Sequence, residues 1–116
     1  MTTTELQRVC RSLPAATEQI QWQKTCVFKI GGKMFACSGL EKDSRYSFKV
    51  DDHRFLELTD VPGIIPAPYL ARAKWVQIDP AVCTLGTSDI EELVRHSHAL
   101  VLAKLPKKTQ RLIREK

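Results

Sequence analysis

An alternation of apolar and polar residues with a period of two most restricts what this chain can fold into. It extends from Thr17 to Val50, and it is typical of β-strands, whose successive side chains point to opposite faces of a sheet. The pattern is clearest where Tyr46, Phe48 and Val50 are expected to face inward. The strands expected from it cover residues 18–23, 26–30, 33–38 and 45–50.

The connections between these strands predict how they pair. Gly31-Gly32 is typical of a tight hairpin turn, because glycine readily adopts positive φ. The strand over residues 33–38 is apolar on both faces, as in the middle of a sheet, while Ile20 and Trp22 are expected to share one face of the first strand. Sequential strands joined by short turns predict an antiparallel sheet.

Helical patterns flank the strands. A first helix is expected over residues 4–13, with Thr4 and Gln7 as its capping box. Asp51 or Asp52 is expected to cap a short helix over residues 53–58. The apolar stripe of the first helix is Leu6, Val9, Cys10 and Leu13.

Two more helices are expected at the C-terminal end. Ser88, with Glu91 three residues later, predicts the start of a long helix that ends near Lys104. Pro106 suits the first position of a last helix over residues 107–115. The core stripe of the long helix is Ile90, Leu93, Val94, Ser97, Leu100 and Val101.

The stretch from Ile64 to Asp79 is the least regular part of the sequence. Its prolines fix φ and remove backbone donors, so its first half cannot be a regular helix. Its second half, residues 75–78, predicts a short strand. Tyr69 and Trp75 are interpreted mainly as architecture, with Trp75 in the core.

The length of 116 residues predicts a single domain, residues 1–116. No apolar run approaches a membrane span of about 20 residues, and no secretory signal is visible, so a cytoplasmic protein is expected. Four scattered cysteines lack zinc-ligand spacing. They are expected to be buried, reduced thiols: Cys10, Cys26, Cys37 and Cys83.

The net charge of +5 is confined to one end of the chain. Residues 1–103 contain 12 basic and 12 acidic side chains, whereas residues 104–116 contain six basic residues and one acidic residue, Glu115. A basic terminal segment is compatible with nucleic-acid binding. It is equally compatible with a solvated helix end whose cations complement the helix dipole.

No catalytic motif is present: the chain lacks Gly-x-Ser-x-Gly, a P-loop and Gly-x-Gly-x-x-Gly. His96 and His98 are about 200° apart around a helix and cannot share a ligand, and His53 is expected to be solvated. We therefore expect a non-enzymatic protein without cofactor or metal.

Three segments, in order, resemble the MmcQ/YjbR-like proteins of bacteria. The first is Gly31-Gly32 followed by Lys33-Met34-Phe35-Ala36, and the second is Pro66-Ala67-Pro68-Tyr69-Leu70 leading to Lys74-Trp75-Val76. The third extends from Ser97 to Leu105-Pro106-Lys107-Lys108, with Ser97-His98 where the family often has Ser-Tyr. The resemblance covers nearly the whole chain.

The resemblance implies a two-layer α+β fold, with an antiparallel sheet, an N-terminal helix and C-terminal helices. This arrangement is similar to the frataxin-like and secretion-chaperone-like folds. Family members are described as DNA-binding, with a double-wing arrangement. The resemblance supplies no catalytic residue and no cofactor.

The first functional hypothesis is therefore DNA binding through phosphate contacts. Lys107, Arg111 and Arg114 fall within about 60° on a helical wheel, with apolar residues opposite, and Tyr69 or Trp75 could stack on bases if exposed. The candidate nucleic-acid-binding residues are Arg72, Lys74, Lys104, Lys107, Lys108, Arg111 and Arg114.

Two other hypotheses compete with DNA binding. One is a protein- or peptide-interaction module that uses the sheet face or a groove beside residues 66–75. The other is a frataxin-like metal binder, which is disfavoured because the first helix has Glu5 against Arg8 and Arg11 rather than an acidic ridge.

Overall fold

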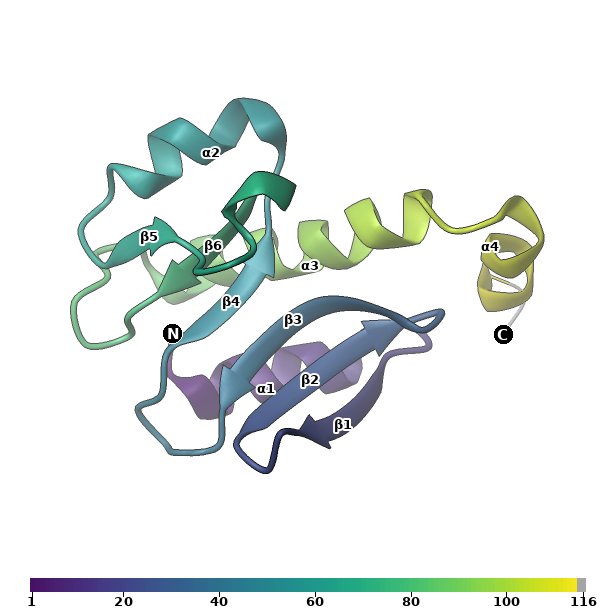
Figure 1. Cartoon of the computed structure of the whole chain (residues 1–116), viewed down its shortest axis with the longest axis horizontal. Helices are drawn as coiled ribbons and strands as arrows, with labels where there is room; N and C mark the ends of the chain where they lie inside the picture. The colour runs from purple at the N-terminus through teal and green to yellow at the C-terminus, as the bar shows by residue number, and fades with distance from the viewer. Residues whose placement is uncertain (115–116) are drawn as a thin grey trace.

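A computed structural model describes residues 1–114 and contains a six-stranded antiparallel sheet in the order β1-β2-β3-β4-β6-β5 (Figure 1). The helices are α1 (Thr3–Ser12), α2 (Asp52–Thr59), η1 (Ala71–Ala73), α3 (Thr87–Ala103) and α4 (Lys107–Arg114). The strands are β1 (Thr17–Gln21), β2 (Thr25–Ile30), β3 (Lys33–Gly39), β4 (Tyr46–Lys49), β5 (Ile64–Pro66) and β6 (Trp75–Ile78).

α1 and α3 form a second layer on one face of the sheet. α3 packs on β3 and β4, α1 lies against both α3 and β3, and α2 contacts β5 and β6. In Figure 1, α1 and α3 lie behind the strands, and α4 stands apart at the far end of α3. The predicted α+β architecture with its antiparallel sheet is confirmed. No helix within residues 1–114 is both long and apolar enough to cross a membrane.

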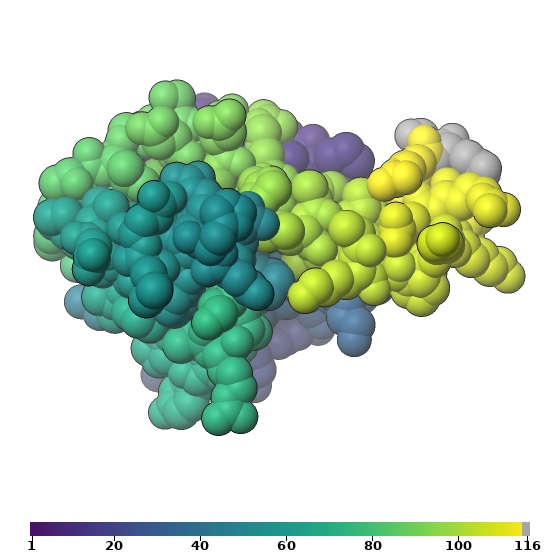
Figure 2. Space-filling model, turned by 90° about the horizontal axis from the view of Figure 1, so that it is seen from above, coloured from purple at the N-terminus to yellow at the C-terminus, as the bar shows by residue number. Residues whose placement is uncertain are grey.

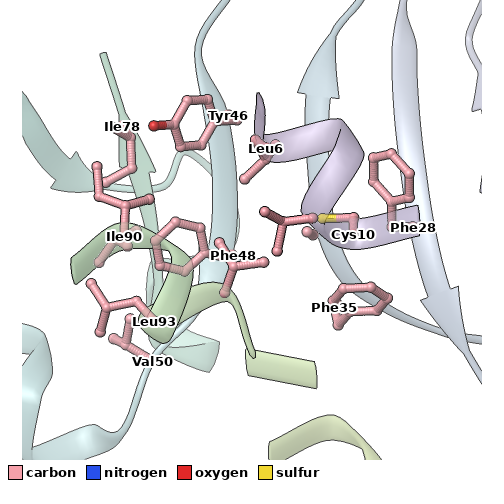
Figure 3. Close-up of a cluster of buried hydrophobic side chains, with 14 of the residues drawn as sticks. Leu6, Cys10, Phe28, Phe35, Tyr46, Phe48, Val50, Ile78, Ile90 and Leu93 are labelled. Atoms are coloured by element: carbon pink, nitrogen blue, oxygen red, sulfur yellow. The ribbon is translucent and has the colours of Figure 1, made fainter. Parts of the chain in front are cut away.

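The core lies between the two layers (Figure 3). The strands contribute Phe28, Tyr46 and Phe48, and the helices contribute Leu6 and Ile90, all almost completely buried. Each large apolar side chain buried in this way stabilises the fold by about 1.5–3 kcal/mol. The inward face predicted for β4 and the apolar stripe predicted for α1 are therefore correct.

The β2–β3 pairing contains a β-bulge near the hairpin end. Phe28 pairs with Ala36 and Lys29 pairs with Met34, so Phe35 is an extra residue. The Ser97 hydroxyl of α3 lies next to it, where the β3–β4 pairing ends: it donates to the Phe35 carbonyl (2.7 Å) and accepts from the Lys49 amide (3.0 Å). Ser97 thus joins α3 to both strands, a link that its place in the predicted core stripe did not reveal.

The predicted helix caps are wrong in detail. α1 is capped by Thr2, whose hydroxyl accepts from the Glu5 amide while the Glu5 carboxylate accepts from the Thr2 amide, so Thr4 lies inside the helix. α3 begins after Gly86, which places Ser88 in the first turn without a capping bond. The reason is that the helices begin one or two residues earlier than the sequence pattern indicates.

Asp51 is the N-cap residue of α2, but its side chain makes no capping bond. Its carboxylate instead lies 2.6 Å from Nε2 of His96 on α3. Glu115, the expected last residue of α4, lies outside the described residues, and α4 is described as far as Arg114.

Two irregular segments also differ from expectation. Trp22 and Gln23 have positive φ (53° and 61°) and form the β1–β2 turn, so Trp22 is exposed rather than on a strand face with Ile20. Ile64, at the start of the irregular stretch, opens β5, a short edge strand that pairs with β6. The sequence did not indicate β5 because its prolines argue against a regular strand. Proline is nevertheless tolerated in an edge strand such as β5.

Candidate functional site

The basic residues of α4 point away from the body of the protein. Lys107, Lys108, Arg111 and Arg114 are all exposed; we call these four residues the α4 basic face. Positions 105, 109 and 113, spaced by one turn, make the buried or half-buried side. In Figure 2, α4 (yellow) projects beyond the rest of the molecule.

Local packing fixes how α4 is presented. Leu105 is 6% exposed and packs on the β2–β3 hairpin, where a Cβ on Gly31 would lie 2.5 Å from its Cδ1. The Gln110 side chain donates to the carbonyls of Ala103 (3.1 Å) and Leu105 (2.7 Å). α4 is therefore held against the hairpin and the end of α3 by specific contacts.

Three residues of the α4 basic face share one concave surface. Lys107, Arg111 and Arg114 line an open hollow of ≈ 530 Å³ together with Ala103 and Gln110. None of the three forms an ion pair with a carboxylate among residues 1–114. Four arginines in the body of the protein do form such pairs: Arg11, Arg45, Arg54 and Arg95.

Lys104 extends the positive charge toward the sheet. It is exposed at the C-terminal end of α3 and lies near Lys49 of β4. Partial burial lowers the pKa of Lys49, and the nearby charges of Lys104 and Lys74 lower it further, against an opposing effect of Asp52. Lys49 alternates with the inward-facing Phe48 and Val50, and nothing else in the sequence marks it as a candidate residue, so it is absent from the predicted set.

The other two predicted residues belong to the β5–β6 loop (residues 67–74). Arg72 is exposed. Lys74 is half-buried, has a φ of 63°, and places its ammonium group 5.1 Å from the centre of the Phe55 ring, a cation–π contact. Lys74 therefore has a structural role in joining the loop to α2.

The predicted residues thus fall into two groups. The α4 basic face and the β5–β6 loop stand out as separate projections, yellow and green in Figure 2. Lys49 lies between them: its Nζ donates to the Ala73 carbonyl in the loop (2.5 Å), and Lys104 is its neighbour on the other side. The structure therefore joins the two groups through a residue outside the predicted set.

The two aromatic residues of this region have opposite environments. Trp75 is 5% exposed, as predicted for a core residue. Tyr69 is fully exposed and has a φ of 67°, so the interpretation of Tyr69 as architecture is wrong. The sequence does not indicate this difference, because both residues follow the same proline-rich segment.

A different hollow, of ≈ 550 Å³, lies between α2 and the first half of α3. The pair formed by His96 and Asp51 lies at its edge, and Asp89 and Glu92 add further carboxylates. Its acidic character is unsuited to phosphate. Within residues 1–114, no group of three or more His, Cys, Asp or Glu side chains is placed to hold a metal ion.

The other two histidines have ordinary surroundings. His98 is buried, lies edge-on to the Phe35 ring at 5.1 Å, and has its Nε2 2.9 Å from the Pro14 carbonyl. His53 is exposed, as expected. Neither is placed beside a nucleophile in the described part of the chain.

Comparison with known proteins gives a family and a fold. The sequence profile of the YjbR family matches residues 11–100, a range that includes the β5–β6 loop and ends before α4. The chain is also similar to the crystal structure of a protein from Pseudomonas syringae, with a TM-score of 0.72 and 19% identity over 87% of this chain and 99% of that one. No curated protein matches the chain.

Proposed function

The chain belongs to the YjbR family, and from that premise we propose that it is a cytoplasmic, non-enzymatic DNA-binding protein whose α4 basic face contacts phosphates. One observation carries the proposal: Lys107, Arg111 and Arg114 line one open hollow on a projecting helix and form no ion pair within residues 1–114. Cations without an ion pair in the described part of the chain are available to replace the counterions of a phosphate backbone.

Two features make this helix a better candidate than a solvated terminal segment. The packing of Leu105 on the hairpin and the hydrogen bonds of Gln110 hold it in one orientation. Lys104 and Lys49 extend the positive surface toward Arg72.

The test compares two charge-matched triple variants by fluorescence anisotropy with a labelled DNA of mixed sequence, as duplex and as single strand. The first replaces Lys107, Arg111 and Arg114 with alanine, which favours helix formation. The control replaces three exposed residues that form no ion pair within residues 1–114 and lie away from α4: Arg8, Lys24 and Lys42.

We expect the α4 variant to lose at least about tenfold in affinity at about 50 mM salt, and the control to stay within about twofold. Equal losses in both variants would show that only overall charge matters. Failure of the unmodified protein to bind either form of DNA would overturn the proposal.

A second candidate function is a protein- or peptide-interaction module beside residues 66–75. It is favoured by a hollow of ≈ 120 Å³ lined in part by Ile65, Gln77 and Val82, of which Ile65 and Val82 are exposed apolar residues. The hollow is smaller than the roughly 300–1,000 Å³ of ordinary ligand sites. Stoichiometric capture of one protein from a lysate, abolished by Ile65→Glu, would favour this candidate over DNA binding.

A further inference from the structure

The ring of Tyr69 makes no buried contact, because its side chain is fully exposed. Its positive φ of 67° belongs to the third position of the turn 67–70, in which Pro68 is second and the Leu70 amide donates to the Ala67 carbonyl. The turn therefore explains the backbone conformation and presents the ring to the solvent, where it is available to a partner.

The loop that presents Tyr69 is firmly anchored on both sides. Ala67 and Trp75 are buried and joined by a hydrogen bond from the Ala67 amide to the Trp75 carbonyl (3.0 Å). Leu70 donates to the Ala67 carbonyl (3.1 Å) and accepts from the Trp75 amide (3.2 Å). An aromatic ring on such a support loses little backbone entropy when it binds a partner.

The charges beside Tyr69 indicate what that partner is. Arg72 is exposed three residues further on, and Lys49 is bonded to the Ala73 carbonyl of the same loop. Lys104 adds a charge next to Lys49. An exposed aromatic ring beside cationic side chains that form no ion pair within residues 1–114 suits a single-stranded nucleic acid, with bases stacking on the ring and phosphates meeting the cations.

We propose that Tyr69 stacks on an unpaired base and that Arg72 and Lys49 hold the adjoining phosphates, so that the ligand is single-stranded DNA. The inference rests on the proposed DNA-binding function and adds the class of DNA. Bases within a duplex are already stacked on one another, so a projecting ring can stack only on a base that is unpaired. Tyr69 then gives a preference for single-stranded over duplex DNA, whereas the α4 basic face binds the phosphates of either form.

The test measures the affinity of the full chain for a labelled single strand and for the duplex of the same sequence. Tyr69→Ala removes the ring at an exposed position and leaves the fold unchanged, and Tyr69→Phe retains the ring. Trp22→Ala is the matched control, because Trp22 is also an exposed aromatic residue with positive φ but lies in the β1–β2 turn.

Tyr69→Ala should weaken single-strand binding by about tenfold and change duplex binding by less than about twofold. Tyr69→Phe and Trp22→Ala should bind the single strand like the unmodified protein. Equal effects of Tyr69→Ala on both forms of DNA, or no effect on either, would overturn the stacking role. If the α4 variant still loses affinity in that case, the DNA-binding proposal stands without it; if the unmodified protein binds no DNA, both fail.

Discussion

Replacing Ser97 with alanine removes a hydroxyl group that joins α3 to both β3 and β4 by hydrogen bonds. The hydroxyl group donates to the Phe35 carbonyl and accepts from the Lys49 amide, at 2.7 and 3.0 Å, and the residue is 0% exposed. The β3–β4 pairing ends at Ala36 and Phe48, so the two backbone groups that the hydroxyl serves lie just beyond the last paired residues. Alanine therefore leaves a buried donor and a buried acceptor without partners.

The expected loss follows from these two groups. Each buried polar group deprived of its partner costs about 1–3 kcal/mol, so we expect Ser97→Ala to lower the free energy of unfolding by about 2–6 kcal/mol. Domains of this size have about 5–15 kcal/mol in total. With an unfolding entropy of about 2.1 cal/mol/K per residue, the melting temperature should fall by about 8–25 °C.

Urea unfolding followed by tryptophan fluorescence measures the effect, since Trp75 is buried in the folded protein. Ser88→Ala is the control: Ser88 is exposed on the same helix and makes no capping bond, so its stability should change by less than about 0.5 kcal/mol. The reasoning is refuted if Ser97→Ala costs less than about 1 kcal/mol. A loss of about 1 kcal/mol in Ser88→Ala would instead restore Ser88 as the cap.

Three further predictions concern packing, acid stability and thiol reactivity. Gly31→Ala should lower the free energy of unfolding by about 1–3 kcal/mol in urea, because φ is positive and the added Cβ would meet Leu105. This loss should be larger than that of Gly32→Ala, whose Cβ would meet nothing within 4 Å. Equal losses would contradict the contact with Leu105. Hydrogen bonds from Arg11 hold the pKa of Glu18 below its ordinary value of 4.5, so the stabilisation from this pair is fully present above pH 4.5 and is lost as the pH falls through the lowered pKa. Glu18→Gln should therefore lower the urea midpoint more at pH 7 than at pH 3. Burial raises the pKa of Cys37 to about 11, so at pH 8 alkylation should be far slower in the native than in the unfolded protein, as mass spectrometry can check.

The regular elements could be predicted because burial imposes a period on the sequence. The alternation of Tyr46, Phe48 and Val50 placed β4 correctly, and the spacing of Ile90, Leu93 and Val94 placed α3. In both cases the side chains that face the core recur with the repeat of the backbone. This information lies within a few residues of sequence.

The helix ends could not be read so accurately. Thr4 and Ser88 have the chemistry of caps, but each lies inside the first turn of its helix. Asp51 is at the predicted end of α2, but its carboxylate contacts His96 of α3, 45 residues later in the sequence, instead of capping the helix. Whether a side chain caps a helix depends on where the helix begins and on whether a distant residue binds that side chain instead. A short sequence motif specifies neither.

The candidate site depended still more on tertiary structure. The exposed, one-sided distribution of Lys107, Arg111 and Arg114 followed from helix geometry and is observed. The position of Lys49 between α4 and the β5–β6 loop required the fold, as did the opposite environments of Tyr69 and Trp75. Proline-rich segments have no repeat from which an outward side can be predicted.

The salt dependence of duplex binding tests the central claim most directly. If Lys107, Arg111 and Arg114 each neutralise one phosphate, together they contribute about 2.7 to the slope of log affinity against log salt concentration. The slope should become shallower by that amount when the three are replaced with alanine and stay unchanged in the Arg8, Lys24 and Lys42 control. Identical slopes for the unmodified protein and the α4 variant would show that α4 does not contact DNA.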